Sequence, residues 1–477
     1  MFDYSQLFKA YDVRGTVPFI NAEVYYWTGY GLVTEVLKPE SLPLNVNLMR
    51  DTRYSSPEFY KAMYYGILDA GGSPVALGLG SSDTMYASCQ YDNCPGAIIT
   101  ASHNPKDDNG VKILKIGSTA LGLDEGLGKI RDFVMTKIEK QPFDISNRPE
   151  LVENLNLKIK VEEFFCNKIK QIGEIDEVDK IMKQRNIKLK IAVDAGNGMG
   201  GFVMNLVKDM YSNIEFVPLY WELDGQFPNH PADPQNFANL KDLQDVIKNH
   251  NVDFGFAFDG DADRVFFVDD KAQVINGDFL VSFFAKSLLN SYHKKPNSAF
   301  NPAVVYLQPG SRAVPETIAE ADGVAIPSQQ GHTKIKANMK KYKAIYGGEF
   351  SGHHYFSDFG YLDSGILGAV LMIKILVEED KKLSEVFTRL QKSYFISDLI
   401  NLTVPDGITF ADVDAKLKTH FKDAVISNFD GISVFYPDWK FSMRPSNTEP
   451  KIRFILESKI NNITDAKVAE VRSVIGF

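Results

Sequence analysis

The chain has 477 residues, of which 44% are hydrophobic and 24% charged, an ordinary balance for a globular protein with several cores. Its formal net charge of −9 provides no general basic field, so we expect no nucleic acid as a partner. The three cysteines, Cys89, Cys94 and Cys166, are too few for a disulfide framework and fit a reducing compartment.

We expect no targeting segment and no membrane segment in this sequence. It begins MFDYSQLFKAYDVRG, which lacks a basic segment followed by an apolar run, so we expect no secretion signal. The most apolar helix-like run, residues 365–377, contains Lys374 and is too short to cross a bilayer. We therefore expect a cytoplasmic protein with no membrane partner.

Short apolar strands alternate with amphipathic helices along most of the chain, which is the pattern of α/β units. Pro57 and Glu58 favour a helix start, and Gly71 favours its end. The predicted helices are 56–68 and 240–248, and the predicted strands are 74–79, 96–99, 190–193 and 253–258. Because strand, turn and helix recur in this order, we predict several related α/β domains.

The last part of the chain has a different pattern, in which strands at 400–404 and 452–456 mix with helices. This pattern predicts a separate α+β domain. The expected linkers are residues 141–150, the region after Asp270, and residues 378–384. The predicted domains are 1–153, 154–272, 273–385 and 386–477.

The first loop with chemical potential is TASHNP, residues 100–105, directly after the strand 96–99. It would hold Ser102 at the carboxyl end of a strand, where α/β proteins bind ligands. His103 and Lys112 are near in sequence and could move protons or bind a phosphate. The alternative is an ordinary polar turn with a capping serine.

The second loop is DGDADR, residues 259–264, after the strand 253–258. Asp259, Asp261 and Asp263 can converge on one hard cation, Mg²⁺ or Ca²⁺. The loop is not an EF-hand, because Asp270 stands where a glutamate is needed. The alternative is a solvated acidic turn, but three crowded carboxylates repel one another unless a cation neutralises them.

The third loop covers residues 347–354, GGEFSGHH, in which Glu349 and Ser351 offer acceptors for sugar hydroxyls. His353 and His354 are adjacent, and adjacent strand residues point to opposite faces, so they are not expected to share one metal ion. Taken alone, the loop fits an ordinary turn at a strand end equally well.

The fourth loop is RPSNTEP, residues 444–450. Arg444 could bind a phosphate with two parallel hydrogen bonds, and the small polar residues Ser446, Asn447 and Thr448 could complete the enclosure. The alternative is an ordinary loop bounded by prolines.

The fifth segment is FKAYDVRG, residues 8–15, from which Tyr11 and Arg14 could reach a phosphate. Together the five segments supply a hydroxyl nucleophile, a hard-cation site, acceptors for a polyol and an anion clamp. Phosphoryl transfer to and from a sugar requires each of these parts.

In combination and in this order, the five motifs resemble those of α-D-phosphohexomutases, the phosphomannomutase/phosphoglucomutase family. The similarity runs from residues 8–15 to 444–450, nearly the whole chain. It implies an α/β fold of four domains around a central cleft, in which three are related α/β domains and the C-terminal one is α+β.

The resemblance also implies roles for individual residues. The implied catalytic residues are Ser102, His103, Lys112 and Arg14. The implied substrate-binding residues are Tyr11, Arg264, His332, Glu349, Ser351, Arg444, Ser446, Asn447 and Thr448. The implied ligands of Mg²⁺ are Ser102, Asp259, Asp261 and Asp263.

By the same resemblance, a phosphoserine at Ser102 donates its phosphate to a hexose monophosphate. A hexose 1,6-bisphosphate, which also serves as activator, then turns over and returns the other phosphate. The expected partners are small hexose phosphates, and the protein is expected to be a monomer or a homodimer. Residues 347–356 and 8–12 are most similar to bacterial phosphomannomutases, which implies mannose phosphates, a route to GDP-mannose, and possible activity on glucose phosphates.

Two segments depart from the family pattern, because residues 307–312, with Gln308, and residues 328–330, with Gln329, lack the lysine that many relatives carry there. Arg312 or Lys334 could compensate. Four alternatives stay open: mainly phosphoglucomutase activity, phosphoglucosamine mutase activity, a phosphomonoesterase that hydrolyses phosphoserine, and a non-catalytic sugar-phosphate binding protein.

Overall fold

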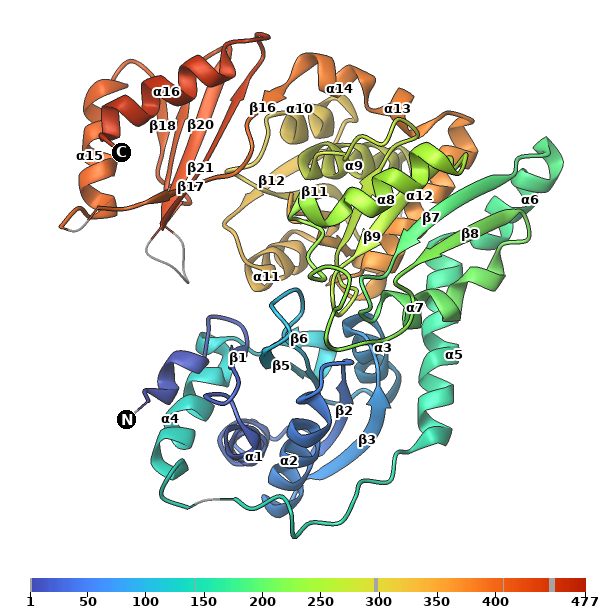
Figure 1. Ribbon diagram of the computed structural model, residues 1–477, viewed down its shortest axis with the longest axis vertical. Helices are drawn as coiled ribbons and strands as arrows, with labels where there is room; N and C mark the ends of the chain where they lie inside the picture. The colour runs from blue at the N-terminus through green and yellow to red at the C-terminus, as the bar shows by residue number, and fades with distance from the viewer. Residues whose placement is uncertain (1, 142, 296–298, 406, 446–450) are drawn as a thin grey trace. The chain divides into compact units, whose positions relative to one another are not determined.

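The computed structural model describes every residue except 1, 142, 296–298, 406 and 446–450. The chain divides into two compact units, each made from segments that are not contiguous in sequence (Figure 1). The first unit comprises Met1–Val274 and Ser351–Leu383, and the second comprises Ile275–Phe350 and Ser384–Phe477.

The first unit begins with an α/β domain built on a mixed sheet in the order β1-β5-β4-β2-β3, with β6 paired to β5. Its strands are β1 (Val13–Thr16), β2 (Asn45–Arg50), β3 (Ser73–Leu79), β4 (Gly96–Ile99), β5 (Asp108–Lys115) and β6 (Thr119–Ala120). Its helices are α1 (Ala22–Gly31), α2 (Ser56–Asp69), α3 (Ser82–Asp92) and α4 (Gly128–Lys137). The strands β2, β3 and β4 are parallel, and β1 and β5 are antiparallel to their neighbours.

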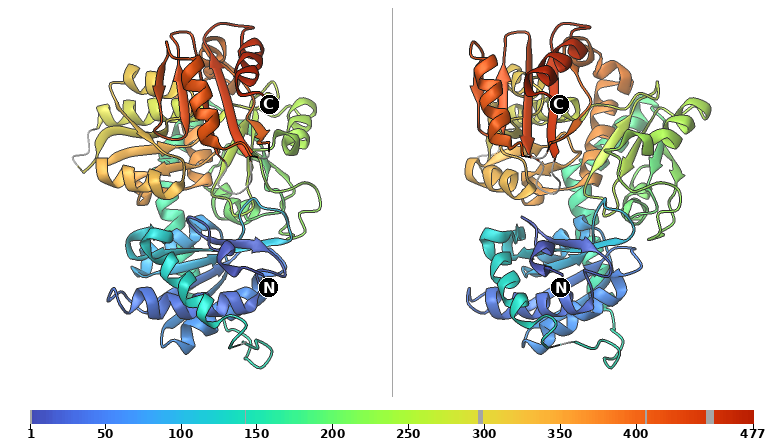
Figure 2. Two further views of the ribbon diagram at one scale, coloured as in Figure 1. Left: turned by 90° about the vertical axis from the view of Figure 1, so that its left-hand side faces the viewer. Right: turned by 60° about the vertical axis from the view of Figure 1, so that its left-hand side comes forward.

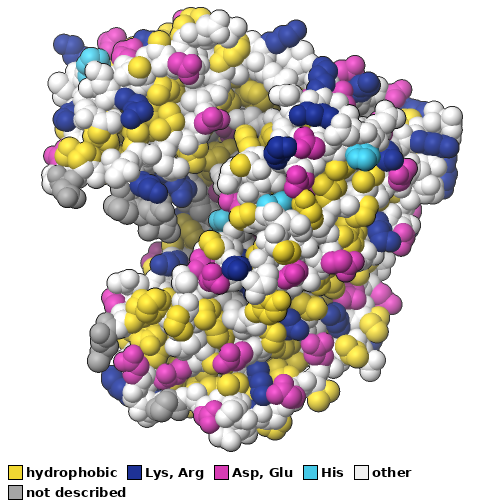
Figure 3. Space-filling model, in the orientation of Figure 1, with side chains coloured by type: hydrophobic (Ala, Val, Ile, Leu, Met, Phe, Trp, Pro, Cys, Tyr) yellow, Lys and Arg dark blue, Asp and Glu magenta, His cyan; other side chains and the backbone are white. Residues whose placement is uncertain are grey.

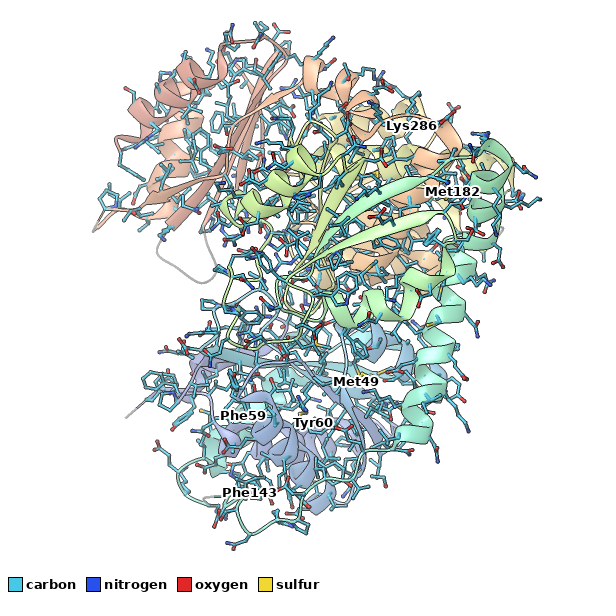
Figure 4. All side chains as sticks on the ribbon, turned by 45° about the vertical axis from the view of Figure 1, so that its right-hand side comes forward. Met49, Phe59, Tyr60, Phe143, Met182 and Lys286 are labelled. Carbon is cyan, nitrogen blue, oxygen red and sulfur yellow. The ribbon has the colours of Figure 1, made fainter. Side chains whose placement is uncertain are left out.

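Parallel pairing brings two loops of this domain to the same edge of the sheet. Arg50 at the end of β2 is opposite Ile99 at the end of β4, so the residues that follow these two strands emerge side by side. Met49, Phe59 and Tyr60, labelled in Figure 4, are buried in β2 and α2. These side chains belong to the core of the domain, whereas the polar residues of the two loops lie at the edge of the sheet.

The second domain of this unit has a four-stranded sheet in the order β10-β9-β7-β8. The strands are β7 (Leu189–Asp194), β8 (Ile214–Leu219), β9 (Phe254–Phe258) and β10 (Val265–Val268), and the helices are α5 (Leu155–Ile172), α6 (Ile175–Arg185), α7 (Gly200–Val207) and α8 (Lys241–Asn249). All five residues of β9 are buried. Antiparallel β9 and β10 form a hairpin, and residues 259–264 are its loop.

The unit is completed by β14 (His354–Phe356), β15 (Leu362–Asp363) and α12 (Gly365–Glu379). Residues 365–377 of α12 are buried, and the helix packs against α5 and α6. This packing explains the apolar run in the sequence as a core helix. Since α12 continues to Glu379, the connection expected at 378–384 starts two residues later than predicted.

The second unit holds three parallel strands in the order β12-β11-β13, with helices α9, α10 and α11. The strands are β11 (Asn301–Leu307), β12 (Val324–Ser328) and β13 (Ala344–Gly348), and the helices are α9 (Gly277–Lys294), α10 (Ala313–Glu320) and α11 (His332–Tyr342). Two short helices, α13 (Leu383–Val386) and α14 (Thr388–Ser393), lead to the last domain.

The C-terminal domain is an antiparallel sheet in the order β16-β21-β20-β19-β18, with β17 also paired to β21. The strands are β16 (Phe395–Ile396), β17 (Ile400–Thr403), β18 (Val425–Ser427), β19 (Ile432–Phe435), β20 (Trp439–Pro445) and β21 (Lys451–Ser458). Figure 2 shows α15 (Phe410–His420) and α16 (Thr464–Ile475) on one face of this sheet. The predicted α+β character of this domain is therefore confirmed.

The secondary structure predicted from periodicity is also confirmed. The helices predicted at 56–68 and 240–248 are α2 and α8, and the four predicted strands are β3, β4, β7 and β9. Among the described residues, no helix is long and apolar enough to cross a membrane. On the face shown in Figure 3, acidic and basic side chains are interspersed over the surface.

Candidate active site

Ser102 lies in the loop between β4 and β5, at the carboxyl end of the parallel strand β4. Its backbone has φ of +52°, a left-handed conformation that few residues other than glycine adopt. The Ser102 amide donates to Oγ1 of Thr100 at 2.9 Å, and the Ser102 hydroxyl donates to Oδ2 of Asp259 at 2.8 Å. The loop thus directs the buried hydroxyl toward the hairpin loop of the second domain.

Three carboxylates converge in the hairpin loop between β9 and β10. Asp259, Asp261 and Asp263 are buried, and an oxygen of each lies within 4.8 Å of the others. Among the described residues, Oδ1 of Asp261 is buried with no hydrogen-bond partner. An all-oxygen set with an unsatisfied buried acceptor fits a hard divalent cation.

Glycines allow the two loops to touch. A Cβ atom at Gly260 would lie 2.3 Å from the carbonyl oxygen of Ser102. A Cβ atom at Gly198, in the turn after β7, would lie 2.8 Å from the carbonyl oxygen of Gly260. Only residues without a side chain permit these backbone approaches, so the glycines set the distance between the serine and the carboxylates.

Lys112, on β5, carries the positive charge nearest to the carboxylates. Its Nζ lies 2.6 Å from Oδ2 of Asp261 and 2.5 Å from Oδ2 of Asp263. Although burial lowers the pKa of Lys112, these carboxylates raise it above its ordinary value. The ammonium group therefore partly neutralises the acidic cluster. Burial raises the pKa of Asp259 to about 7, in opposition to the charge of Arg264.

His103 and Arg14 adjoin the serine loop. Nδ1 of His103 lies 3.3 Å from Oγ of Ser102, and burial, together with the charges of Arg264 and Arg14, lowers the pKa of His103 well below its ordinary value. Nη1 of Arg14 donates to Oδ1 of Asn104 at 2.9 Å. The imidazole is thus neutral, and Arg14 is anchored to the loop that carries it. Tyr11, in the same N-terminal segment as Arg14, is half-buried.

Arg264 follows the carboxylates directly and is buried beside them. Its Nε donates to Oδ2 of Asp259 at 3.0 Å, and its Nη1 lies 3.9 Å from Oδ1 of Asp233. Nη2 is buried and has no hydrogen-bond partner among the described residues. Because an unsatisfied buried donor is unfavourable, this group is available to a ligand oxygen.

Three further residues lie at this site that the sequence did not predict as site residues: Ser82, His353 and Asp363. Ser82 begins α3 and donates its hydroxyl to Oδ2 of Asp261 at 2.6 Å. Nε2 of His353 lies 3.5 Å from Oδ1 of Asp263 and 4.0 Å from Oδ2 of Asp363. Ser82 had no signal in sequence, because a serine at a helix start is usually a cap.

The third loop divides between the two units. Ser351 belongs to the first unit, where its hydroxyl lies 3.1 Å from Nδ1 of His353. His353 belongs to a group that could hold a metal, together with Asp263 and Asp363, whereas His354 does not. Burial lowers the pKa of His354 to about 3. The expectation that the two histidines do not share an ion stays a prediction.

The remaining predicted residues belong to the second unit. Glu349 is buried just after β13, His332 begins α11, and Arg444 lies in β20. Ser446, Asn447 and Thr448 lie outside the described residues.

Gln308 and Gln329, in the two segments that lack the family's lysines, form hydrogen bonds with the C-terminal domain. The Gln308 side chain accepts from the Ser433 hydroxyl at 3.2 Å, and Nε2 of Gln329 donates to the carbonyl of Phe429 at 2.7 Å. Arg312 donates to the backbone carbonyls of Tyr436 and of two nearby residues. The guanidinium group of Arg312 is therefore used in domain packing, and Lys334 is exposed on α11.

The fold and the site define the class: a multidomain α/β protein in which a serine hydroxyl faces three buried carboxylates that could hold a hard cation. Family models match the chain in order. They are phosphoglucomutase/phosphomannomutase alpha/beta/alpha domains I (residues 5–138), II (163–273) and III (276–394), and the C-terminal domain of the same family (399–472). The chain belongs to the phosphoglucomutase/phosphomannomutase family, as the motifs predicted, and this makes it a phosphohexomutase, an isomerase.

Whole-chain relatives support this conclusion. A phosphomannomutase of Escherichia coli is 31% identical, over 98% of each chain. A phosphomannomutase/phosphoglucomutase of Pseudomonas syringae is 32% identical, over 98% of this chain and 94% of the relative. The crystal structure of a family protein from Burkholderia thailandensis has a TM-score of 0.81 and 25% identity, over 100% of this chain and 98% of that one. An N-acetylphosphoglucosamine mutase of Aspergillus fumigatus, solved with GlcNAc-6P and magnesium, shares the fold at a TM-score of 0.61 and 13% identity, over 98% of this chain and 95% of that one.

Proposed function

We propose that the chain interconverts mannose 1-phosphate and mannose 6-phosphate through a phosphoserine at Ser102, and acts on glucose phosphates as a second substrate pair. The whole-chain likeness to phosphomannomutases supports mannose. The relative from Pseudomonas syringae, named for both activities, supports glucose. The domain boundaries 1–153, 154–272, 273–385 and 386–477 remain part of this proposal, as does a monomeric or homodimeric state.

The observation that carries the phosphoserine proposal is the hydrogen bond from the Ser102 hydroxyl to Asp259, at 2.8 Å. An ordinary turn serine would cap a helix or face solvent. Here the hydroxyl is buried beside three carboxylates that fit a cation. This arrangement favours a group that is phosphorylated, because a cation held by the same carboxylates would neutralise the phosphate oxygens.

Each half-reaction breaks one bond to phosphorus and forms another. A free hydroxyl of the hexose monophosphate attacks the phosphorus of phosphoserine, the bond between phosphorus and Oγ of Ser102 breaks, and a hexose 1,6-bisphosphate results. The sugar hydroxyl loses its proton, for which the neutral imidazole of His103 is the base, since its lowered pKa keeps a ring nitrogen unprotonated. The imidazolium then gives this proton to Oγ of Ser102, which lies 3.3 Å from Nδ1 of His103, as Oγ leaves phosphorus. In the second half-reaction the Ser102 hydroxyl gives its proton to His103 and attacks the phosphorus of the other phosphate. The bond between that phosphorus and the sugar oxygen breaks, and the sugar oxygen takes the proton from His103.

Positive side chains around the serine balance the charge on the phosphate. Lys112, Arg264 and Arg14 approach the serine and the metal loop from β5, the hairpin loop and β1. Glu349 and Ser351 are proposed to accept hydrogen bonds from the sugar hydroxyls. Arg444 and His332 are proposed to bind the phosphate that does not react, together with Ser446, Asn447 and Thr448, which lie outside the described residues. Tyr11 would contact the substrate from the N-terminal segment.

Asp259, Asp261, Asp263 and the phosphoserine oxygen would hold Mg²⁺. Hard oxygen ligands and the unsatisfied Oδ1 of Asp261 fit this ion. The ion supplies charge neutralisation for the transferring phosphoryl group. Magnesium in the related mutase from Aspergillus fumigatus supports the choice. A hexose 1,6-bisphosphate is proposed as the activator, because it rephosphorylates Ser102 when the intermediate escapes.

The experiment measures conversion of mannose 1-phosphate and glucose 1-phosphate to their 6-phosphates, with Mg²⁺ and a trace of hexose 1,6-bisphosphate. Ser102→Ala is assayed beside the wild type, and Thr100→Ser serves as a control that keeps the loop hydrogen bond to the Ser102 amide. We expect conversion by the wild type and the control, and none by Ser102→Ala. The ratio of kcat/KM for the two sugars identifies the preferred one.

Other products would overturn the proposal. Release of inorganic phosphate in place of the 6-phosphate would indicate a phosphomonoesterase. Binding of sugar phosphate without either product would indicate a binding protein. Preferred conversion of glucosamine 1-phosphate would assign the chain to another branch of the family.

A further inference from the structure

A buried arginine outside the motifs contacts the backbone of the serine loop. Arg53 lies in the connection between β2 and α2, and only 1% of its surface is exposed. Guanidinium groups are rarely buried to this degree unless their hydrogen bonds are satisfied. The position follows from the sheet, because β2 and β4 are adjacent and parallel and their following loops emerge together.

The guanidinium group donates to four carbonyl oxygens of one loop. Nη1 donates to Pro105 at 2.6 Å and to Asp108 at 3.0 Å. Nη2 donates to Ser102 at 2.7 Å and to Asn104 at 2.7 Å. A guanidinium group has five N–H donors in a fixed plane, so four of them are used on residues 102–108.

The remaining nitrogen, Nε, forms an ion pair that anchors the arginine, without a hydrogen bond to any described residue. Nε lies 3.2 Å from Oδ2 of Asp51. Oδ1 of Asp51 accepts from the Arg53 amide at 3.0 Å and from the Ser56 hydroxyl at 2.6 Å. Asp51, which is itself bound to Ser56 at the start of α2, therefore orients the guanidinium group. The guanidinium group in turn holds the backbone of the loop.

The end of the loop is held by the same network. Nδ2 of Asn109 donates to the hydroxyls of Ser55 at 2.6 Å and Ser56 at 3.1 Å. Tyr25 donates its hydroxyl to Oδ1 of Asn109 at 3.1 Å. The residues around Arg53 therefore hold the loop that carries Ser102 at Ser102 itself and again at Asn109, the second residue of β5.

Ser102 needs such support, because a non-glycine residue with φ of +52° persists only where its surroundings hold it. Its carbonyl oxygen accepts from Arg53, and its hydroxyl donates to Asp259. The ring of Phe227, from the second domain, lies 5.1 Å from Cζ of Arg53. Arg53 therefore contacts the nucleophile loop on one side and the domain of the metal loop on another.

We propose that Arg53 is a positioning residue for phosphoryl transfer: it holds the backbone of residues 102–108 so that Oγ of Ser102 faces the carboxylates. The inference rests on the proposed phosphoserine at Ser102. Lysine cannot replace the arginine, because a single ammonium has three donors at one point and cannot reach four separated carbonyls. Direct contact with the sugar is not needed for this role.

The test compares Arg53→Lys with Leu32→Ala, a control fully buried in the core of the same domain. The control reports loss of stability without loss of the loop contacts. Four quantities are measured on each protein: kcat and KM for the mutase reaction, the rate of phosphate transfer from a hexose 1,6-bisphosphate to Ser102, and hydrogen exchange of residues 102–108. Thermal unfolding gives the folded fraction.

For Arg53→Lys we expect kcat and the transfer rate to fall by about 30- to 100-fold, since a displaced nucleophile reacts slowly, with KM within about threefold. Exchange at 102–108 should rise while the core of the domain stays protected. A transfer rate within about twofold of the wild type would overturn the inference. The inference would also be overturned if Leu32→Ala and Arg53→Lys, with equal decreases in melting temperature, showed equal decreases in the transfer rate.

A second variant is needed because the lysine of Arg53→Lys could form new hydrogen bonds with the loop and mask the loss of the guanidinium group. Arg53→Ala leaves room for a guanidinium ion, so millimolar guanidinium should restore part of the transfer rate, whereas sodium chloride at equal ionic strength should not. Absence of rescue in folded Arg53→Ala would contradict the positioning role. Hydrogen exchange separates the two proposals. If the wild type forms no phosphoserine, the proposed function fails, and with it the role of Arg53 in phosphoryl transfer. If residues 102–108 still exchange faster in Arg53→Lys, the hold of Arg53 on the loop stands on its own.

Discussion

Ser102 and Asp259 are 157 residues apart in the chain, and the hydroxyl of the first donates a 2.8 Å hydrogen bond to a carboxylate oxygen of the second. Each residue lies in a loop that follows a strand, β4 for Ser102 and β9 for Asp259, and the two strands belong to different sheets. Gly260, next to Asp259, permits the approach, because its missing side chain leaves room for the Ser102 carbonyl. The contact joins the proposed nucleophile to the carboxylates that could hold a cation.

Replacing Lys112 with methionine should tighten the binding of Mg²⁺ and slow the reaction. The ammonium group neutralises Asp261 and Asp263, so without it the carboxylates should bind the cation about tenfold more tightly. Loss of the charge beside the transferring phosphate should lower kcat by about 100-fold or more. Calorimetric titration with Mg²⁺ measures the first effect. Weaker binding by the variant would show that Lys112 supports the metal site instead of competing with it.

Gly260→Ala should separate the serine from the metal loop. The new Cβ atom would lie 2.3 Å from a backbone oxygen, which cannot rotate away, so a loop must shift. We expect kcat to fall by about 100-fold, as is typical for a misplaced reacting group. Gly71→Ala is the control, because its φ of +83° makes it destabilising by about 1 kcal/mol without touching either loop. Equal kcat in both variants would contradict the prediction.

The His230–Asp194 pair should make stability depend on pH. Although burial alone lowers it, the hydrogen bond and charge of Asp194 raise the pKa of His230 above its ordinary value. The protonated form is therefore favoured in the folded state. Its contribution is complete below the unfolded-state pKa of about 6.5 and is lost as pH rises through the higher folded-state pKa.

Chemical denaturation at several pH values measures this effect. The free energy of unfolding of the wild type should decrease relative to that of His230→Gln as pH rises from about 6.5 through the folded-state pKa. An identical pH dependence of the two proteins would show that the pair does not contribute.

Arg312→Met should destabilise the second unit. The guanidinium donates to the carbonyl oxygens of Tyr436 at 2.7 Å and Pro437 at 2.8 Å, and the variant leaves these acceptors unsatisfied. We expect the free energy of unfolding to fall by about 2–4 kcal/mol. KM for hexose phosphates should change little, because the side chain is used in packing. A large rise in KM with unchanged stability would instead assign Arg312 to phosphate binding, as a substitute for the lysines absent at Gln308 and Gln329.

The sequence alone determined the local structure and the chemical parts of the site. The spacing of apolar residues predicted α2, α8 and four strands, because the periodicity of a helix or a strand is set by residues close to one another in sequence. Ser102 and the three aspartates were identifiable because each lies in a short motif after a strand. Those motifs also carried the family resemblance that whole-chain relatives then confirmed.

Only the tertiary structure decided which of these parts meet and what supports them. Arg53, Ser82 and His353 join the site through contacts between segments distant in sequence, which no local period encodes. Arg312 could have been a phosphate ligand by its sequence position, yet the structure shows it donating to backbone carbonyls. Burial explains the difference: a polar side chain removed from water must satisfy its hydrogen bonds where the fold places it, and that place depends on the whole chain.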